Sequence, residues 1–290
     1  MINMKSKFQE AFEGFSPVLS DEQIKAEIQK IIDKHYDSLN NKDSIKLIHS
    51  CVDLTSLNPT DHVDHIYNFV KQVNELDETN PTIPPVAAIC VYPNFVKTVK
   101  DALMVQDVAI ACVSGAFPSS QSFLETKIVE TGLAVADGAD EVDIVLHLGN
   151  FLAGNYQEVA DEIQEIKAAC KGKKLKVILE TGALKKAENI QRASILSLFC
   201  DADFIKTSTG KEYPGASLEA AYVMCQVLKE YDAKYGIKRG LKVSGGIRTT
   251  EEAIKYLCIV KEILGDEWMN NKLFRVGASS LVTDLQKRLD

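Results

Sequence analysis

The sequence of 290 residues predicts an α/β fold, a (β/α)8 TIM barrel with an N-terminal helical extension. Eight short apolar runs rich in β-branched residues alternate with longer amphipathic segments, which is typical of parallel strands joined by helices. Eight such repeats over roughly 250 residues match the usual size of a closed barrel. The alternative, a doubly wound open sheet, would normally show a Gly-x-Gly-x-x-Gly turn after its first strand, and the sequence has none.

The composition is that of an ordinary globular protein, with 46% hydrophobic and 26% charged residues. The net charge of -8 argues against nucleic acid as a partner, because nucleic-acid-binding proteins usually carry a dominant basic face. The seven cysteines are odd in number and form no Cys-x-x-Cys pair, which indicates the reduced thiols of a cytosolic protein. We see no signal peptide and no membrane-spanning segment, so we expect a cytoplasmic location and no membrane partner.

Residues 1–42 are predicted to form the helical extension, and residues 43–290 the catalytic barrel domain. Ser20 is a helix-start signal, and isoleucines recur at helical spacing behind it, from Ile24 to Ile32. A polar stretch rich in asparagine then ends this helix. We expect the helix to pack against the barrel, and a partner-binding arm is the alternative.

The eight predicted strands are short apolar runs that follow one another at regular spacing. They lie at residues 51–54, 86–92, 108–114, 141–146, 176–180, 203–207, 241–244 and 273–276. The clearest predicted helices between them carry an apolar stripe, and they lie at residues 158–169, 217–233 and 249–264.

A lysine lies inside the sixth predicted strand, where residues 203–211 read DFIKTSTGK and include Lys206. A buried ammonium group is unfavourable unless it is paired or loses its proton, and the neutral amine can attack a carbonyl carbon. Lys242 follows one strand–helix–strand unit later, so the two lysines should lie on neighbouring strands. Two lysines in one partly desolvated pocket lower the pKa of one of them, which makes Lys206 a candidate nucleophile.

Two aspartates accompany these lysines on other predicted strands. Asp53 ends the first strand, and Asp143 interrupts the fourth. The carboxyl ends of barrel strands form the active face, so both carboxylates should reach the pocket of the lysines. Asp143 could bind a lysine or a substrate hydroxyl and transfer a proton. The alternative is an ordinary buried salt bridge, but charged residues at several strand ends favour a functional site.

Three loops that contain glycine follow the last three predicted strands and together predict a phosphate site. Glycines let backbone N–H groups approach an anion, a helix N-terminus adds donors, and barrels commonly bind phosphate after their last two strands. A Walker-type loop is excluded, because Ile205 occupies its first glycine position and Glu212 follows Lys211. The predicted phosphate-binding residues are Gly210, Lys211, Gly245, Gly246, Gly277, Ser279 and Ser280.

Three further residues or pairs are less informative. His62 and His65 have the spacing of a metal pair but supply only two ligands, so we expect no metal and no cofactor. Glu180 ends the fifth predicted strand and faces either the pocket or a structural partner. Cys90 lies in a predicted strand, where a packing role is expected.

Five segments resemble the deoxyribose-phosphate aldolase family, whose members are Schiff-base aldolases built on a (β/α)8 barrel. The resemblance extends from about residue 50 to about residue 285, and its most specific motif is the one that contains Lys206. The segments are DLTSLN at 53–58, ADEVD at 139–143, LETG at 179–182, FIKTSTGK at 204–211 and GGIRT at 245–249.

The resemblance implies reversible cleavage of 2-deoxy-D-ribose 5-phosphate to D-glyceraldehyde 3-phosphate and acetaldehyde, a step of deoxyribose phosphate catabolism. It also implies that Lys206 forms the imine and that Lys242 is the neighbouring cation that tunes it. In the same way, Asp143 and Asp53 are expected to support proton transfer.

Thr55 and Thr207 lie in the matching segments and complete the predicted substrate-binding set. The expected partner is a small phosphosugar, and a homo-oligomer remains possible. Two enzyme alternatives are another Schiff-base aldolase of a phosphosugar and a metal-dependent aldolase on the same barrel. An alternative from another class is a non-catalytic phosphosugar-binding barrel.

Overall fold

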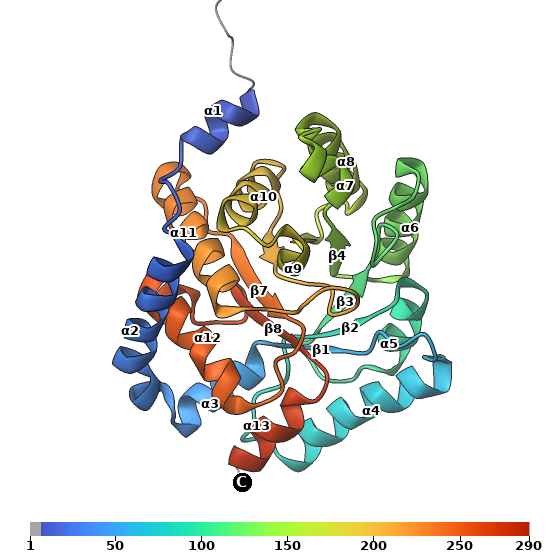
Figure 1. Cartoon of the computed structure of the whole chain (residues 1–290). Coiled ribbons are helices and arrows are strands. Elements are labelled where there is room, and N and C mark those ends of the chain that lie inside the picture. Colours follow the sequence, from blue (N-terminus) through green and yellow to red (C-terminus); the bar gives the residue numbers. More distant parts are fainter. Residues whose placement is uncertain (1–6, 290) are drawn as a thin grey trace, which may run out of the picture.

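The computed structural model describes residues 7–289 and shows a closed barrel of eight parallel strands, so the predicted fold class is confirmed (Figure 1). The strands are paired in sequence order, and the last pairs with the first. The strands are β1 Val52–Thr55, β2 Ala88–Val91, β3 Ala109–Val113, β4 Glu141–Val145, β5 Lys174–Ile178, β6 Phe204–Lys206, β7 Gly240–Ser244 and β8 Phe274–Ala278.

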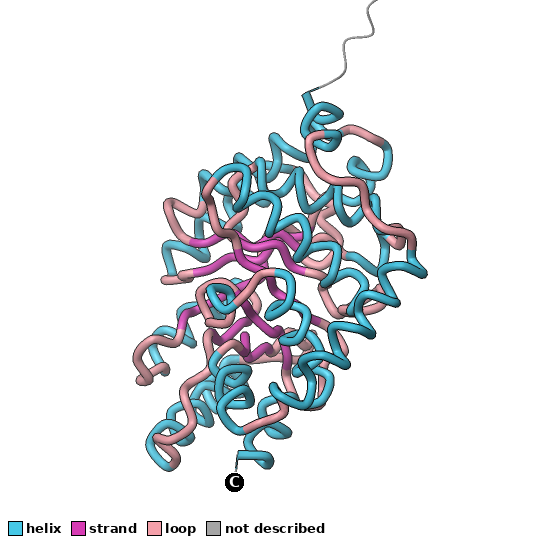
Figure 2. Tube along the Cα trace, turned by 90° about the vertical axis from the view of Figure 1, so that its left-hand side faces the viewer, coloured by secondary structure: helices cyan, strands magenta, loops and turns pink. Residues whose placement is uncertain are grey.

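Helices surround the barrel on its outside, with the strands at the centre of the molecule (Figure 2). Both faces of each strand are covered, so nearly all strand residues are buried. The strands β2 and β3 are continuous apolar runs, whereas most of the others alternate apolar residues with buried charged ones. The helices and short 3-10 turns after β1 are α4 Val63–Thr79, η1 Pro93–Phe95, α5 Val96–Ala102, α6 Leu124–Asp137, α7 Leu148–Ala153, α8 Tyr156–Ala169, α9 Thr181–Leu184, α10 Ala187–Phe199, α11 Leu218–Tyr235, α12 Thr250–Ile263, η2 Asp266–Trp268 and α13 Leu281–Leu289.

Three helices precede the barrel: α1 Lys7–Glu13, α2 Asp21–Leu39 and α3 Lys42–Ser50. The predicted start of α2 is confirmed, because Ser20 caps it and forms a capping box with Gln23. The buried isoleucines of α2 face α11 and α12, along which the helix lies in Figure 1. The division into an extension at 1–42 and a barrel at 43–290 stays a prediction, and residues 1–6 lie outside the described part of the chain.

Two apolar clusters form the core. The larger one fills the layer between the strands and the helices. The smaller one combines Leu57 with small side chains of two strands, Ala88 and Cys90 from β2 and Ala111 and Val113 from β3. Among the described helices, none has an apolar stretch that could cross a bilayer.

Strand boundaries differ from the predicted ones by up to two residues. β1 continues to Thr55, two residues beyond Asp53, so the prediction that Asp53 ends the strand is wrong. β5 ends at Ile178, which leaves Glu180 in the turn after it. β8 continues to Ala278, so Gly277 lies in the strand and not in a loop.

Packing of α2 on the barrel is testable with Ile24, which is buried against the barrel helices. We expect Ile24→Ala to lower the free energy of unfolding by about 2–5 kcal/mol, because the deletion leaves a cavity. Urea denaturation followed by circular dichroism measures this change. Lys25→Ala, on the exposed side of the same helix, is the matched control and should stay within about 0.5 kcal/mol of the unchanged protein. Equal stability of the two variants would contradict the packing of α2.

Candidate active site

Lys206 and Lys242 lie side by side, as the sequence predicts, because β6 and β7 place their Cα atoms opposite each other. Both side chains are buried and point to the barrel interior. Each Nζ atom lies 2.8 Å from the same oxygen, Oδ2 of Asp143 on β4. The structure therefore brings together the two lysines and the aspartate that the sequence singled out.

The Asp143 carboxylate is fully buried among three lysines. Its second oxygen, Oδ1, accepts a hydrogen bond of 2.9 Å from Lys176 on β5. Burial alone raises the pKa of Asp143, but Lys176, Lys206 and Lys242 outweigh it and hold this pKa well below its usual range. Asp143 is therefore an anion at neutral pH.

The two neighbouring lysines have opposite pKa shifts. Burial lowers the pKa of Lys206, and the charge of Lys242 lowers it further, so that the single carboxylate of Asp143 does not restore its usual value. Burial also lowers the pKa of Lys242, but Asp143 and Asp53 together outweigh this and raise it. Lys206 is thus the amine that loses its proton more easily.

Asp53 lies deeper in the barrel than the sequence predicts. Its Oδ2 atom is 2.6 Å from Lys242 Nζ and 3.3 Å from Lys176 Nζ, although neither contact has good hydrogen-bond geometry. Its Oδ1 atom accepts a 2.6 Å bond from Arg275 on β8. Burial raises the pKa of Asp53, but the three cations lower it by more, so this pKa lies below its usual value. Asp53 therefore contacts Lys242 from below and does not line the cavity.

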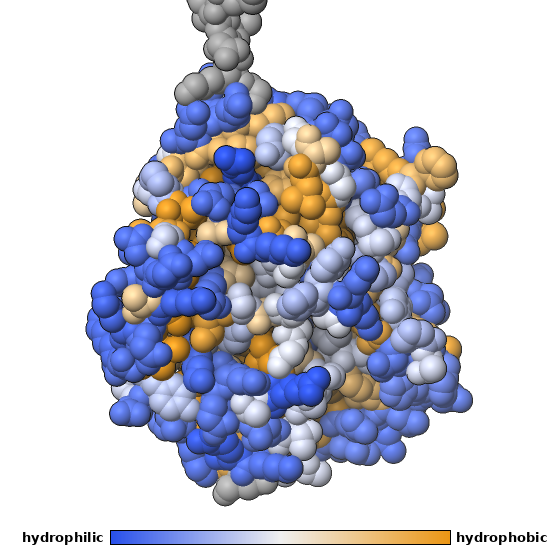
Figure 3. Space-filling model, in the orientation of Figure 1, coloured by the Kyte–Doolittle hydropathy of each residue, from blue (hydrophilic) through white to orange (hydrophobic). Residues whose placement is uncertain are grey.

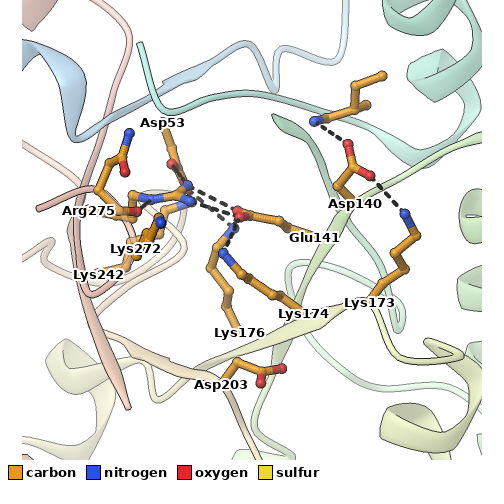
Figure 4. Close-up of polar contacts among 12 residues, drawn as sticks. Asp53, Asp140, Glu141, Lys173, Lys174, Lys176, Asp203, Lys242, Lys272 and Arg275 are labelled. Carbon is orange, nitrogen blue, oxygen red and sulfur yellow. Dashed lines mark hydrogen bonds and ion pairs between the residues drawn. The ribbon is translucent and has the colours of Figure 1, made fainter. Parts of the chain in front are cut away.

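Three charged residues of this interior were missed by sequence reasoning: Glu141, Lys176 and Arg275. Arg275 donates to both oxygens of Glu141, at 2.8 and 3.0 Å, and Lys176 lies 2.7 Å from Glu141. Figure 4 shows Arg275 and Lys176 pointing toward Glu141. Strand alternation was the available signal, because residues two apart on one strand face the same side, as Glu141 and Asp143 do.

A cavity of about 260 Å³ opens above the Lys206 amine at the carboxyl ends of the strands. Its centre is pale, with weakly polar residues, and its rim is strongly hydrophilic on the face shown in Figure 3. The predicted residues that line it are Thr55, Lys206, Gly210, Lys211, Gly245, Gly246, Gly277, Ser279 and Ser280. Arg248 lines it as well and adds a cation.

Thr207 is the predicted binding residue that the structure does not bring to the cavity. It is fully buried, and its hydroxyl donates to the Ser244 carbonyl at 3.1 Å and accepts from the Ser244 amide at 3.0 Å. Thr207 therefore fixes the end of β6 against β7.

One end of the cavity has the features of an anion site. Gly210, Gly245 and Gly246 line this end and have φ of +74°, +88° and +85°, a conformation that favours glycine and is typical of backbone turns that bind anions. The chain enters α13 directly after Ser279 and Ser280, so unpaired helix amides lie near the same place. The cavity can therefore hold a carbonyl at Lys206 and a phosphate at its other end.

Gly277 lines the cavity and also makes room for a neighbouring side chain. On β8 it lies next to Ser244, and a Cβ atom here would stand 3.0 Å from Lys242 Cε and 2.8 Å from Ser244 Cβ. The missing side chain makes room for the Lys242 stem.

Glu180 contacts a structural partner and does not line the cavity. Its carboxylate accepts a hydrogen bond from the Thr209 hydroxyl at 2.5 Å and another from the Thr209 amide at 3.2 Å. Burial raises the pKa of Glu180 more than these bonds lower it. Glu180 thereby holds the loop that leads to Gly210 and Lys211.

The histidine pair is engaged in a helix start. The His62 ring accepts a hydrogen bond from the His65 amide, and the His65 ring lies 2.8 Å from Asp61. Across residues 7–289, no three His, Cys, Asp or Glu side chains are grouped as metal ligands. Cys90 packs in the small apolar cluster, as expected.

Residues 47–282 match the DeoC/LacD family aldolase. A putative deoxyribose-phosphate aldolase of Caenorhabditis elegans is 43% identical over 254 residues, which cover 87% of this chain and 84% of the relative. The Mus musculus deoxyribose-phosphate aldolase is 42% identical over 205 residues, or 70% of this chain and 64% of the mouse enzyme. A solved structure of a putative deoxyribose-phosphate aldolase from Coccidioides immitis superposes with a TM-score of 0.72 at 27% identity and covers 93% of this chain and 98% of its own.

The hold of Glu180 on its loop can be measured by hydrogen exchange. We expect Glu180→Ala to accelerate exchange of the Thr209 amide by about tenfold to a hundredfold, because a hydrogen bond to a charged acceptor contributes about 1.5–3 kcal/mol. Glu180→Gln is the matched control, since its amide oxygen can still accept from Thr209. Unchanged exchange in the alanine variant would show that other contacts hold the loop.

Proposed function

We propose the following reaction for this chain, which belongs to the DeoC/LacD family of aldolases and is therefore a lyase. It reversibly cleaves 2-deoxy-D-ribose 5-phosphate to D-glyceraldehyde 3-phosphate and acetaldehyde, through a Schiff base on Lys206. The observation that carries this proposal is the position of Lys206, a buried amine with a lowered pKa at the floor of a cavity whose other end is built for an anion.

In the first step, neutral Lys206 attacks the aldehyde carbon of the open-chain sugar phosphate. Uptake of one proton from solvent and loss of water then give a protonated imine, which can accept the electron pair of the bond that breaks later. Lys242 supports this step in two ways: its charge favours the neutral form of Lys206, and it shares the Asp143 oxygen that Lys206 contacts.

In the second step, the C3 hydroxyl loses its proton and the C2–C3 bond breaks. We assign the proton to Asp143 through a water molecule, because the carboxylate lies below the cavity and does not line it. The products are D-glyceraldehyde 3-phosphate and an enamine on Lys206. Protonation of the enamine and hydrolysis then release acetaldehyde.

The anion end of the cavity orients the substrate. Gly245, Gly246, Ser279 and Ser280 offer backbone and hydroxyl donors, and Lys211 lines the same cavity. The Lys211 ammonium group donates to the Leu57 carbonyl, so this lysine also ties the β6 loop to the loop after β1. Binding the phosphate away from the reacting carbon places that carbon at Lys206.

The wider setting is part of the proposal. The phosphosugar is the only substrate assigned, with no metal or organic cofactor and no nucleic-acid partner, and the net charge of -8 supports the last point. We place the enzyme in the cytoplasm, in deoxyribose phosphate catabolism. A homo-oligomer fits the proposal, since a related fold from Aeropyrum pernix is described as tetrameric (TM-score 0.66, 23% identity).

Borohydride reduction in the presence of 2-deoxy-D-ribose 5-phosphate tests the imine. We expect one reduced adduct per chain, at Lys206, when peptides are mapped by mass spectrometry, because only a protonated imine is reduced to a stable amine. Lys206→Met is the control and should give no adduct. An adduct on another lysine would overturn the assignment.

The same preparation separates the rival functions. A metal-dependent aldolase would form no adduct, and a non-catalytic phosphosugar-binding barrel would release no D-glyceraldehyde 3-phosphate in a coupled assay. Trapping together with release is the result that the proposal requires.

The tuning role of Lys242 can be tested through the pH dependence of kcat/KM. Lys206 acts as the neutral amine, so activity falls as the pH falls through its pKa, and the lowered pKa extends activity toward neutral pH. Lys242→Leu removes a repelling charge and leaves Asp143 with fewer cations, and both changes raise the pKa of Lys206. We expect the acid limb to move to higher pH by about one unit or more.

Lys229→Leu, which removes an exposed lysine of α11, is the control for the change in total charge. It should leave the acid limb in place, because water screens its charge. If the acid limb of Lys242→Leu coincides with that of the control, Lys242 does not tune Lys206.

A further inference from the structure

The barrel interior contains more charge than the proposed reaction uses. Among residues 7–289, a cluster of seven charged side chains, each less than 5% exposed, lies inside the strands. We call it the interior charge cluster, and its members are Asp53, Glu141, Asp143, Lys176, Lys206, Lys242 and Arg275. It consists of three carboxylates and four basic groups.

The pairing within this cluster is uneven. Lys176 contacts all three carboxylates, Lys242 contacts Asp53 and Asp143, and Arg275 contacts Asp53 and Glu141. Lys206 pairs with Asp143 alone in the part of the chain that the structure describes.

Three carboxylates balance three cations, and Lys206 is the fourth basic group. With Arg275, Lys176 and Lys242 charged, the interior is neutral when Lys206 has lost its proton. Adding that proton creates an uncompensated positive charge on a buried side chain, which is unfavourable.

We propose that Glu141 and Arg275 are positioning residues for Lys206: they touch neither the cavity nor Lys206, and their charges complete the neutral set that keeps the Lys206 amine deprotonated. This inference deepens the proposed function and rests on it in one respect, the role of the neutral Lys206 amine as the nucleophile. Arg275 acts through Asp53, which contacts both Arg275 and Lys242. Glu141 acts through Lys176, which contacts both Glu141 and Asp143.

Other groups around Lys206 leave this balance unchanged. Cys90 on β2 is a buried thiol whose pKa is raised by burial, so it stays neutral. β3 contributes the apolar Ala111 and Val113. Glu180, in the turn after β5, is held by the Thr209 loop, and its pKa is raised as well. Lys174 contacts Glu141 at 3.4 Å, but its side chain is 42% exposed, so water screens its charge.

The charge balance predicts the direction of each single change. Arg275→Met leaves one negative charge in excess, which a proton on Lys206 neutralises, so the pKa of Lys206 rises. Glu141→Gln leaves one positive charge in excess and lowers this pKa further. Each shift should be about one unit, the size produced by a unit charge about 10 Å away at an effective dielectric constant of about 20.

The double variant Glu141→Gln with Arg275→Met is the decisive test, because it removes one charge of each sign. The two shifts should cancel, and Lys206 should titrate within about 0.3 pH units of the unchanged protein, since the net charge of the interior is the same. A purely structural role of the pair predicts no such cancellation.

The measurement is the pH dependence of acetylation of Lys206 by acetic anhydride, read by peptide mass spectrometry from pH 5 to 10. It reports the pH at the midpoint of the Lys206 titration, and it requires no catalytic turnover. If the midpoints move as stated while the unchanged protein releases no D-glyceraldehyde 3-phosphate, the proposed function fails and this inference stands.

Two controls complete the set. Arg275→Lys keeps the charge and loses the paired hydrogen bonds, so its midpoint should be unchanged, as should that of Lys174→Ala. Should Arg275→Met not fold, Glu141→Gln and the double variant still differ by about one unit under the proposal. Single variants that shift in the same direction, or a double variant that differs from the unchanged protein as much as Glu141→Gln does, would overturn it.

Discussion

The structure depends on one shared contact, the Oδ2 atom of Asp143 with the ammonium positions of Lys206 and Lys242. A single carboxylate oxygen cannot compensate two charged amines in a buried site. The two amines differ in their contact with Asp53, which lies next to Lys242 and not next to Lys206. Because of that asymmetry, Lys242 stays charged and Lys206 loses its proton more easily. Lys206 is then the amine that can attack, and Lys242 is the cation that keeps it neutral.

The barrel makes this contact possible through the alternation of its strands. Residues two apart face the same side, and the register sets Asp143 opposite Lys176 and Lys206 opposite Lys242. The charged side chains come from β1 and from β4 to β8, whereas β2 and β3 contribute small apolar ones. Gly277 leaves the space that the Lys242 stem occupies. Charge, volume and register are thus matched across the interior.

The sequence predicts the eight strands and the neighbouring lysines because these depend on local pattern and on spacing along the chain. The depth of Asp53 was predicted wrongly because the apolar pattern does not fix where the first strand ends, and the strand continues two residues further. Lys176, Glu141 and Arg275 lie within the predicted strands and were missed for another reason. Their inward orientation follows only from counting two residues along the strand from a side chain that is known to face inward. The orientation of Thr207 depends on its contact with Ser244 across the strands.

The interior charge cluster is better explained by chemistry than by stability. Barrel interiors are normally filled by bulky branched side chains, and replacing a buried ion pair by apolar residues of similar volume is often neutral or stabilising. A cluster with four basic groups and three carboxylates also contributes little to stability, because one basic group has no carboxylate of its own. It is well chosen for a reaction that needs one neutral amine beside a fixed cation. The basic group in excess is Lys206. Lys206 is also the one member of the cluster that lines the cavity, because the other charged side chains lie below the carboxyl ends of the strands.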